Sequence, residues 1–526
     1  MLDLLQRMSI SGLVLVGLSA LAAESRAASG GMIPVGEPIE AELRILEVWP
    51  AAGDTSLPHL STLPLQRGEA AAVERAAARR GSAERSPRTL ALRRVGRELA
   101  RDAVEGSSQG GTTARWFDRR SDDGSRLEAS VGLVGAASFL RESSRWHEPS
   151  WMDGSGLRTR LTASIGPWVA HTDLAAGHLS DVRTFSDALI EGRDIALSTD
   201  DSYLALAPGT AWQARVGRTR AHWGPGEEAS LLLSRTAPSL SGFALGGRLA
   251  SLRSHLSVLH ATTDPGRSEQ LAAHRIEWQP KPGLRIGVAE AARYRSSGWQ
   301  AGYLASVIPF SLVQRMLDQD SGGSDDSVRN NVLLSVDAAW RVADGTRLYG
   351  ELLVDDLHAR SRAFSDKWGY QLGLDGAGPW GKMRLSWNTE YTRLSRYVYT
   401  SYYGRRHTAR GEPLGHPIGP DASRLRVRIT CDSDDAWQLS AIVSQTDRGE
   451  GRLDEAFVPG SPVQDPMDFE GVVERNRRIE GELRWWPATG IDASLRLGAE
   501  RTRDADHIAG NTRHGLVARV ALALWR

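Results

Sequence analysis

The sequence predicts an all-β transmembrane β-barrel preceded by a small α-helical segment, and three observations favour this fold class. From residue 126 onward, apolar and polar side chains alternate with a period of two, in many segments of about ten residues. The polar parity of these segments carries charges of both signs, as the lumen face of a membrane barrel does. The chain also starts with a short apolar stretch typical of an export signal.

Composition excludes several classes of protein. The chain has 526 residues, enough for one large barrel plus an appendage. Its 64 basic residues balance 64 acidic ones, which argues against a nucleic-acid partner. After the N-terminus no stretch offers about 20 consecutive apolar residues, which excludes a polytopic helical membrane protein. Cys431 is the only cysteine, so no disulfide framework or cysteine-based metal site is expected.

Residues 1–27 are expected to be a signal peptide. Arg7 supplies a short basic region, and Ile10–Ala22 is apolar but too short to span a bilayer stably. Small residues offer cleavage after Ala22 or Ala27. We therefore expect an exported protein.

Residues 28–122 are expected to be a helical unit, a bundle or plug, that packs on something larger. They are rich in Ala, Glu and Arg, and Pro-containing linkers at Pro58, Pro64 and Pro87 interrupt them. The expected helices cover Glu37–Leu46, Gly68–Arg80 and Leu90–Val104.

Residues 123–526 are expected to form the barrel. Roughly 16–20 segments alternate as half-buried strands do. Long interruptions at 294–330, 395–423 and 447–475 are expected on the extracellular side, where barrel loops are long. The final strand, Leu516–Trp525, places an aromatic residue near the end of the chain.

A short motif between two apolar runs is the most specific sequence pattern in the chain. Gly224-Pro225-Gly226 forces a tight loop, and from the residues alone this is an ordinary hairpin turn after a tryptophan. The pattern W-G-P-G, then S-L-x-L-S, then a proline resembles the signature of the capsule-assembly outer-membrane barrels, the Wzi-like family. The signature loop comprises Arg218, His222, Trp223, Gly224, Pro225 and Gly226, and Ser230, Leu231, Leu233, Ser234 and Pro238 extend the match.

The resemblance implies a barrel of about eighteen strands in the outer membrane. It also implies a helical bundle at residues 28–122 and a lectin-like function, the attachment of capsule or exopolysaccharide to the cell surface. The expected partners are this polysaccharide, outer-membrane lipid and lipopolysaccharide. We expect no nucleic acid, no cofactor and a monomer.

The best binding candidates lie in the Tyr- and Arg-rich loop. Aromatic faces stack on sugar rings, and arginine addresses carboxylates and hydroxyls. An interfacial aromatic girdle is the alternative for this loop. The candidate polysaccharide-binding residues are Tyr402, Tyr403, Arg405, Arg406, His407 and His416.

Six strand residues are expected to point into the lumen. They form either a charge network that fills and rigidifies the lumen, which we favour, or a polar lining that contacts a glycan. These residues are Arg347, Tyr349, Glu351, Asp355, Arg384 and Glu390.

Two other functions stay open. In a porin or transport channel, the Arg/Glu-lined lumen would set selectivity. An outer-membrane hydrolase would need a nucleophile or a carboxylate pair converging with a histidine. The chain shows no HExxH spacing, no G-x-S-x-G elbow and no P-loop, so we expect neither an enzyme nor a metal site.

Overall fold

A computed structural model describes most of the chain. The described residues are 32–33, 35, 38–49, 59–66, 69–70, 87–100, 117–121, 125–140, 156–178, 188–190, 195–207, 211–304, 309–313, 330–356, 365–402, 404–433, 437–458, 461–488 and 490–525. The expected signal over 1–27, most of the expected helix Gly68–Arg80 and the binding candidate Tyr403 lie outside these ranges.

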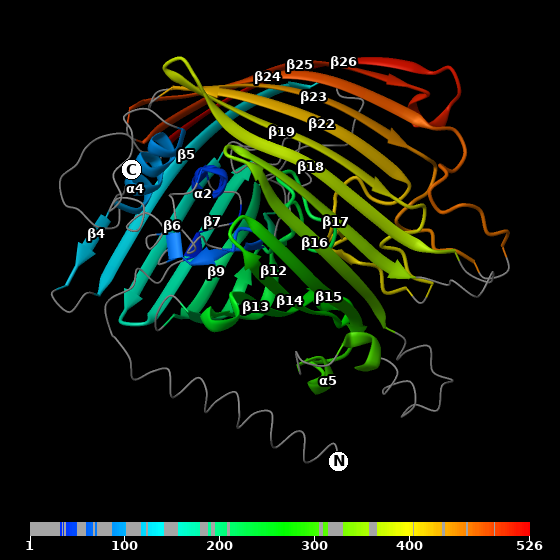
Figure 1. The fold of residues 1–526 in the computed structure, drawn as a ribbon, viewed down its shortest axis with the longest axis horizontal. Coiled ribbons are helices and arrows are strands. Elements are labelled where there is room, and N and C mark those ends of the chain that lie inside the picture. The colour runs from blue at the N-terminus through cyan, green and yellow to red at the C-terminus, as the bar shows by residue number, and fades with distance from the viewer. Residues whose placement is uncertain are drawn as a thin grey trace.

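Within the described residues, eighteen antiparallel strands close into one barrel (Figure 1), which confirms the expected fold class and strand number. The first nine are β5 (Arg126–Leu140), β6 (Gly156–Ile165), β7 (Trp168–His178), β9 (Ile195–Leu206), β10 (Trp212–Thr219), β12 (Leu240–Leu249), β13 (Ser254–Asp264), β14 (Glu269–Lys281) and β15 (Leu284–Arg295). The others are β16 (Asn331–Ala343), β17 (Thr346–Asp356), β18 (Lys367–Trp380), β19 (Met383–Leu394), β22 (Ala422–Asp432), β23 (Trp437–Arg448), β24 (Glu474–Ala488), β25 (Ile491–Arg503) and β26 (Thr512–Trp525).

The barrel closes where β26 pairs with β5, over Val517↔Leu140 to Trp525↔Gly132. Trp525 is buried on the lumen side, and its ring fills the space that a side chain at position 132 would need, 2.6 Å from an added Cβ. The Arg160 guanidinium lies over the same ring at 5.4 Å. Because residue 132 is a glycine, the Trp525 ring fits beside it, and the last strand can pair with the first.

Two short strands extend the sheet beyond the eighteen. β8 (Ala188–Ile190) pairs with β9, and β4 (Phe117–Arg120) pairs with the first four residues of β5. β4 thus belongs to the barrel sheet, although its residues lie within the range 28–122 expected for the helical unit.

Each strand follows the parity that the sequence shows. In β16, Val336 and Trp340 are exposed on the outer face, whereas Asp337 between them is buried on the lumen face. Such apolar side chains form the lipid-facing surface of a membrane barrel. Five exposed tryptophans lie near the strand ends that short turns connect, as an aromatic girdle does: Trp168, Trp278, Trp340, Trp380 and Trp485.

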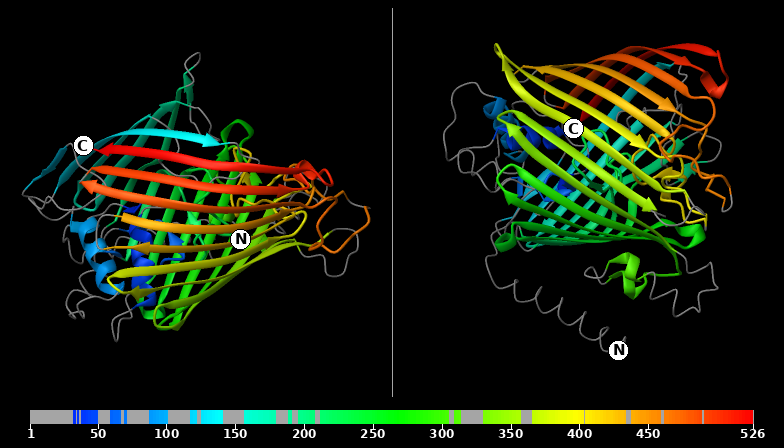
Figure 2. Two further views of the ribbon diagram at one scale, coloured as in Figure 1. Left: turned by 90° about the horizontal axis from the view of Figure 1, so that it is seen from above. Right: turned by 45° about the vertical axis from the view of Figure 1, so that its right-hand side comes forward.

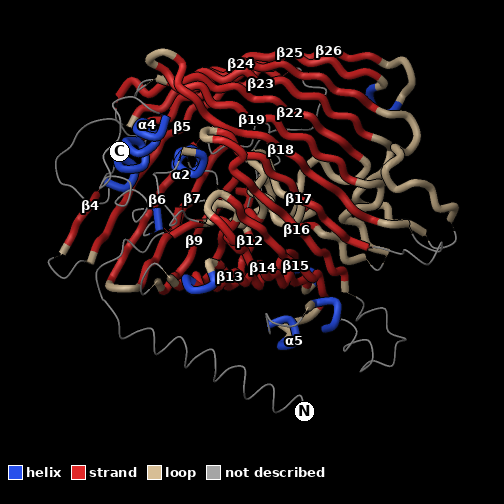
Figure 3. The backbone as a smooth tube through the Cα atoms, in the orientation of Figure 1, coloured by secondary structure: helices blue, strands red, loops and turns tan. Residues whose placement is uncertain are grey.

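The N-terminal segment folds against the inside of the wall at the short-turn end. It contains α2 (Pro38–Val48) and α4 (Pro87–Ala100), which pack on one another and contact β18 (Figures 1 and 3). The Trp49 indole donates to the Ala377 carbonyl (2.7 Å), and the Gly345 amide donates to the Val48 carbonyl (2.9 Å). The end of α2 and Trp49 after it therefore hold the β16–β17 turn and β18 from within.

Both helices begin at a proline. Proline at the first helical position loses no hydrogen bond, and its fixed φ suits the helix. Pro87, which we expected in a linker, is therefore the first residue of α4. In the described part of the chain, none of the helices has the length and apolar character needed to cross a membrane.

The loops at the opposite end take two different courses (Figure 2). The segments after β10 and β19 fold inward, whereas the segment after β15 folds over the outer face of the wall. There Tyr303 in α5 (Ala301–Leu304) stacks on Tyr294, with ring centroids 4.9 Å apart, and Phe310 packs with them. The described part of loop 294–330 thus covers β14 and β15 from outside the wall.

Candidate functional site

The signature loop lies inside the barrel and joins it to the N-terminal segment. Its short strand β11 (His222–Trp223) pairs with β2 (Thr62–Leu63). The Gly224 amide donates to the Ser61 carbonyl (2.9 Å), and the Trp223 amide donates to the Leu233 carbonyl (2.8 Å). The tight turn expected at Gly224-Pro225-Gly226 therefore brings a loop from one end of the barrel to a segment from the other.

A buried carboxylate explains the glycine and the serine of the signature. Glu351 on β17 accepts hydrogen bonds from the Leu231 amide (3.0 Å) and the Ser335 hydroxyl (2.8 Å), and Ser230 lies within 3.2 Å. Gly224 has φ +152°, and a Cβ there would lie 2.6 Å from Glu351 Oε2. Only glycine lets the backbone approach this carboxylate so closely.

The imidazole of His222 stabilises the same turn. Its Nε2 lies 3.0 Å from the Gly226 carbonyl, and its Nδ1 accepts the Arg235 amide at 3.3 Å. Burial lowers the pKa of His222 well below its usual value, so the ring is neutral. Arg218 lies half-buried at the end of β10.

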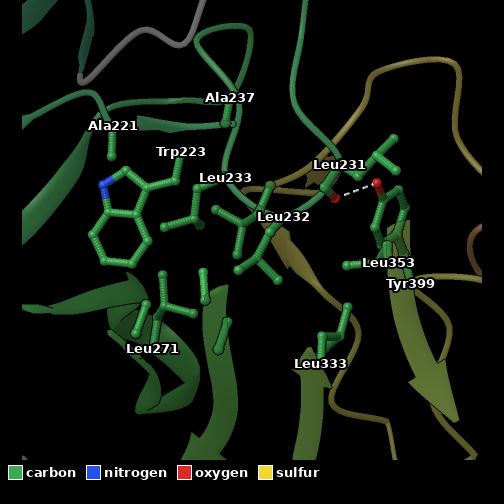
Figure 4. Close-up of a cluster of buried hydrophobic side chains, with 14 of the residues drawn as sticks. Ala221, Trp223, Leu231, Leu232, Leu233, Ala237, Leu271, Leu333, Leu353 and Tyr399 are labelled. Atoms are coloured by element: carbon green, nitrogen blue, oxygen red, sulfur yellow. Dashed lines mark hydrogen bonds between the residues drawn. The ribbon is translucent and has the colours of Figure 1, made fainter. Parts of the chain in front are cut away.

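The segment 395–421 folds onto the signature loop (Figure 4). The Tyr399 hydroxyl donates to the Leu231 carbonyl (2.5 Å), and the Ser234 amide donates to the Leu414 carbonyl (2.8 Å). On the other side, the Tyr399 amide donates to Asp355 on β17 (2.8 Å). The two inward loops share an apolar cluster with the wall, comprising among others Trp223, Leu231, Leu232, Leu233, Leu271, Leu333, Leu353, Val398, Tyr399, Leu414 and Ile418.

All six strand residues expected in the lumen are buried. All of them except Tyr349 form a hydrogen bond with a segment that folds into the barrel. Arg347 binds Asp375 and donates to the Pro225 carbonyl (3.2 Å). The Tyr349 hydroxyl donates to Glu390 (2.7 Å), which also accepts the Glu227 amide (3.1 Å). The structure thus brings Arg347, Tyr349 and Glu390 together under the signature loop, and gives Glu351 and Asp355 separate loop partners.

Arg384 fastens helix α2. Its guanidinium forms a bidentate pair with Glu42 (2.6 and 2.8 Å) and also binds Asp432 (2.7 Å), while Arg94 from α4 binds Glu42 (2.8 Å). Burial raises the pKa of the Glu42 carboxyl, but the pairs with Arg384 and Arg94 outweigh it and lower the pKa to about 2. Glu42 is therefore charged, and its ion pairs hold the two helices to the wall.

The binding candidates in the Tyr- and Arg-rich loop separate into two groups. His407 and His416 are fully buried, and Arg405 is 2% exposed. His407 Nε2 donates to the Leu232 carbonyl (2.7 Å), and burial lowers the pKa of His407 to about 3. These three side chains face the interior of the fold and present no surface to a polymer.

Tyr402 and Arg406 remain accessible. Tyr402 is 53% exposed, and Arg406 is half-buried with its carbonyl accepting a hydrogen bond from Arg293 (3.1 Å). Hydrogen bonds from Tyr399 and His407 join this segment to the signature loop. The backbone that carries Tyr402 is therefore held in place.

Comparison with known proteins decides the family. The model of the family "Capsule assembly protein Wzi" matches residues 94–515. The chain belongs to this family.

One solved structure agrees with this assignment at the level of the fold. Wzi of Escherichia coli, described as an outer-membrane protein involved in group 1 capsule assembly and a carbohydrate-binding β-barrel, is 15% identical with a TM-score of 0.64. The alignment covers 93% of this chain and 99% of that one. OccD3 (OpdP) of Pseudomonas aeruginosa is 10% identical with a TM-score of 0.43, over 81% of this chain and 95% of that one. Among curated proteins, no sequence matches.

The Wzi-family barrel lies in the outer membrane. Its lipid-facing parity is apolar along the wall, with Leu352, Leu372, Ile429 and Val443 all exposed between the strand ends. The tryptophans near the short turns complete the interfacial band.

Sequence reasoning missed the partners through which this Wzi-family wall holds its N-terminal segment. Arg275 on β14 binds Asp337 (2.5 Å) and donates to the Thr62 hydroxyl (2.8 Å), which itself donates to Glu277 (2.8 Å). His59 lies 3.3 Å from the same Glu277 carboxylate. The polar parity of β14 and β16 could have marked these charges as lumen-facing, but nothing local indicates their partners.

Proposed function

We propose that the protein binds a surface polysaccharide at its outer loops and so attaches capsule or exopolysaccharide to the cell. The observation that carries this proposal is that the exposed Tyr402 belongs to a loop held in place by hydrogen bonds. Two long loops fold inward, bond to each other through Tyr399 and Leu231, and leave Tyr402 exposed above them. Membership in the capsule assembly family supports the polymer as the ligand.

The binding is non-covalent and multivalent in this proposal. Tyr402 offers a ring face for stacking on a sugar, and Arg406 offers a planar guanidinium for a carboxylate or hydroxyl pair. Each contact is weak, but a polymer that meets many barrels on one cell gains avidity from their number.

We propose that the protein is not an enzyme. A hydrolase needs an accessible base next to a nucleophile or a carboxylate pair. The loop histidines His222, His407 and His416 are fully buried, and each ring has at least one nitrogen in hydrogen-bond contact with a group of the fold. This is an arrangement for holding loops in place.

A channel is the second candidate, and one feature of the wall favours it. Along β22 to β25 the lumen face carries a strip of partly exposed arginines around Glu482, within 2.9 to 3.3 Å of it. Such a strip could select small anions or cations. The strip comprises Arg428, Glu482, Arg484 and Arg496.

The first test uses the polysaccharide of the producing strain and purified full-length protein. Removing the ring in Tyr402→Ala removes a stacking contact of about 0.5–1.5 kcal/mol, or about two- to tenfold in affinity per site. The same variant in cells should shed more polysaccharide into the medium. Arg406→Ala should add to the loss, whereas Tyr402→Phe, which keeps the ring, should bind nearly as the parent protein does.

The control for folding is the heat-dependent shift of the barrel on a gel, which these exposed substitutions should leave unchanged. Unaltered binding and retention in the Tyr402→Ala, Arg406→Ala double variant would contradict the proposed site. Absence of binding by the parent protein would contradict the proposed function itself.

A further inference from the structure

Three buried side chains from three separate segments meet under the signature loop. They are Glu228 of that loop, Glu390 of β19 and His416 of the segment 395–421. One potential ligand atom of each lies within 4.8 Å of the others. Two carboxylates and one imidazole at this spacing can hold a metal ion.

One carboxylate oxygen in this cluster has no partner within the described structure. Glu390 is 2% exposed, and its Oε2 accepts the Tyr349 hydroxyl (2.7 Å) and the Glu227 amide (3.1 Å). Its Oε1 is buried and accepts no hydrogen bond. An unpaired buried carboxylate oxygen is costly, and a second carboxylate nearby adds repulsion, so the pair needs a proton or a cation between its members.

Two arginines lie beside the carboxylates of this cluster. Arg424 pairs with Glu228 (2.8 Å), and Arg426 on β22 is the register partner of Glu390. Among the described residues, the His416 imidazole makes only long hydrogen bonds, from the Ile418 amide to its Nδ1 (3.3 Å) and between its Nε2 and the Thr392 hydroxyl (3.4 Å). A metal ion could replace either of these weak contacts.

We propose that Glu228, Glu390 and His416 bind one divalent transition-metal ion, zinc by class, which fastens both inward loops to the barrel wall. One nitrogen and two oxygen donors suit Zn²⁺, whereas Ca²⁺ and Mg²⁺ prefer oxygen ligands alone. The site goes beyond glycan attachment, because it acts on the closure of the lumen whatever the outer face binds. No spacing in the sequence predicts it, since the three ligands are 26 to 188 residues apart (390 to 416 and 228 to 416).

The test measures metal in full-length protein without an affinity tag. The protein is stripped with EDTA, titrated with Zn²⁺ against a chromophoric chelator, and its metal content is measured after gel filtration. We expect a single equivalent of zinc per chain and a higher unfolding temperature of the zinc-loaded form. Co²⁺ bound to the unaltered chain should show the absorption of a nitrogen- and oxygen-ligated site, which tests the site without any substitution.

Substitutions then locate the ion. Glu390→Gln and His416→Gln should abolish the retained equivalent, and Tyr349→Phe, which removes the hydroxyl that orients Glu390, should weaken binding about 10–100-fold. His274→Gln is the matched control, because His274 pairs with Glu290 (3.4 Å) on the outer face, away from the cluster. It should bind zinc as the parent protein does.

Two results would overturn the proposal. If the parent chain retains no zinc against the chelator, the two carboxylates share a proton instead. If Glu390→Gln and His416→Gln bind zinc with the parent affinity, the ion lies elsewhere. Neither result would bear on polysaccharide binding, which is measured separately at Tyr402.

Discussion

Glycine at position 224 is required for two independent reasons. Its φ of +152° is one that side-chain-bearing residues rarely adopt, and a Cβ would meet both Ser230 and Glu351. Those two neighbours are themselves held by hydrogen bonds, so they cannot move aside without losing them. The conformation of one residue therefore maintains the contact between the signature loop and β17.

Substitution Gly224→Ala should destabilise the folded barrel by about 1–3 kcal/mol, the usual cost of a strained backbone position. The measurement is the temperature at which the compact band converts to the unfolded band on a gel. Gly481→Ala is the control, because an added Cβ there meets nothing within 4 Å. Equal conversion temperatures for the two variants would refute this account of the signature glycine.

At the scale of elements, the N-terminal helices are held by ion pairs and not only by apolar contacts. Glu42 receives guanidinium groups from α4 and from β19 at once. Removing one partner of a buried ion pair leaves the others uncompensated. The attachment of α2 should therefore depend strongly on this single carboxylate.

The variant Glu42→Ala should weaken the docking of α2 and α4 by about 3–5 kcal/mol. Limited proteolysis of the folded barrel should then cut the helical segment sooner than in the parent protein. Asp454→Ala, which breaks the exposed pair of Arg452 with Asp454 (3.1 Å), should change nothing measurable. Unaltered protection in Glu42→Ala would mean that the apolar contacts alone hold the helices.

At the scale of the whole molecule, the lumen is occupied from both ends. The helices enter from the short-turn end, the signature loop and the segment 395–421 enter from the other, and they meet where Trp223 pairs with Thr62. Removing one set should leave the other in place, because each set has its own bonds to the wall.

Planar-bilayer conductance tests this arrangement. We expect the full-length protein to conduct little, and a chain without residues 28–116, which keeps β4, to conduct in small, unsteady steps. A chain that also lacks the inner part of the signature loop should show a large, stable conductance. Large, stable conductance of the full-length protein would instead support the channel, with the arginine strip around Glu482 as its selective surface.

The barrel could be predicted from the sequence because strand parity is a local property. Val336 and Asp337 differ in burial as their alternation indicates, and the same holds around the wall. The course of the loops could not be predicted in this way. Phe310 of loop 294–330 packs outside the wall, and only the folded sheet shows which of its faces carries Ala272 and Tyr294.

The binding residues show the same limit. His407 and His416 lie in a polar loop, and a polar loop usually lies on the surface. The nearby apolar residues Leu414 and Ile418 were the available signal of burial, and both are buried in the apolar cluster. Partners such as Glu42 and Arg384 are 342 residues apart, and no local pattern relates them.

The cross-bonding of the inner loops has a mechanical consequence. A polymer held at the outer loops pulls on them whenever fluid shears the cell. Tyr399 would pass that force to β17 through Asp355, the signature loop would pass it to β19 through the Glu227 amide, and Thr62 would pass it to β14. The load is then shared in parallel by three strands that are not neighbours in the sheet, so the attachment resists peeling of any single hairpin from the membrane.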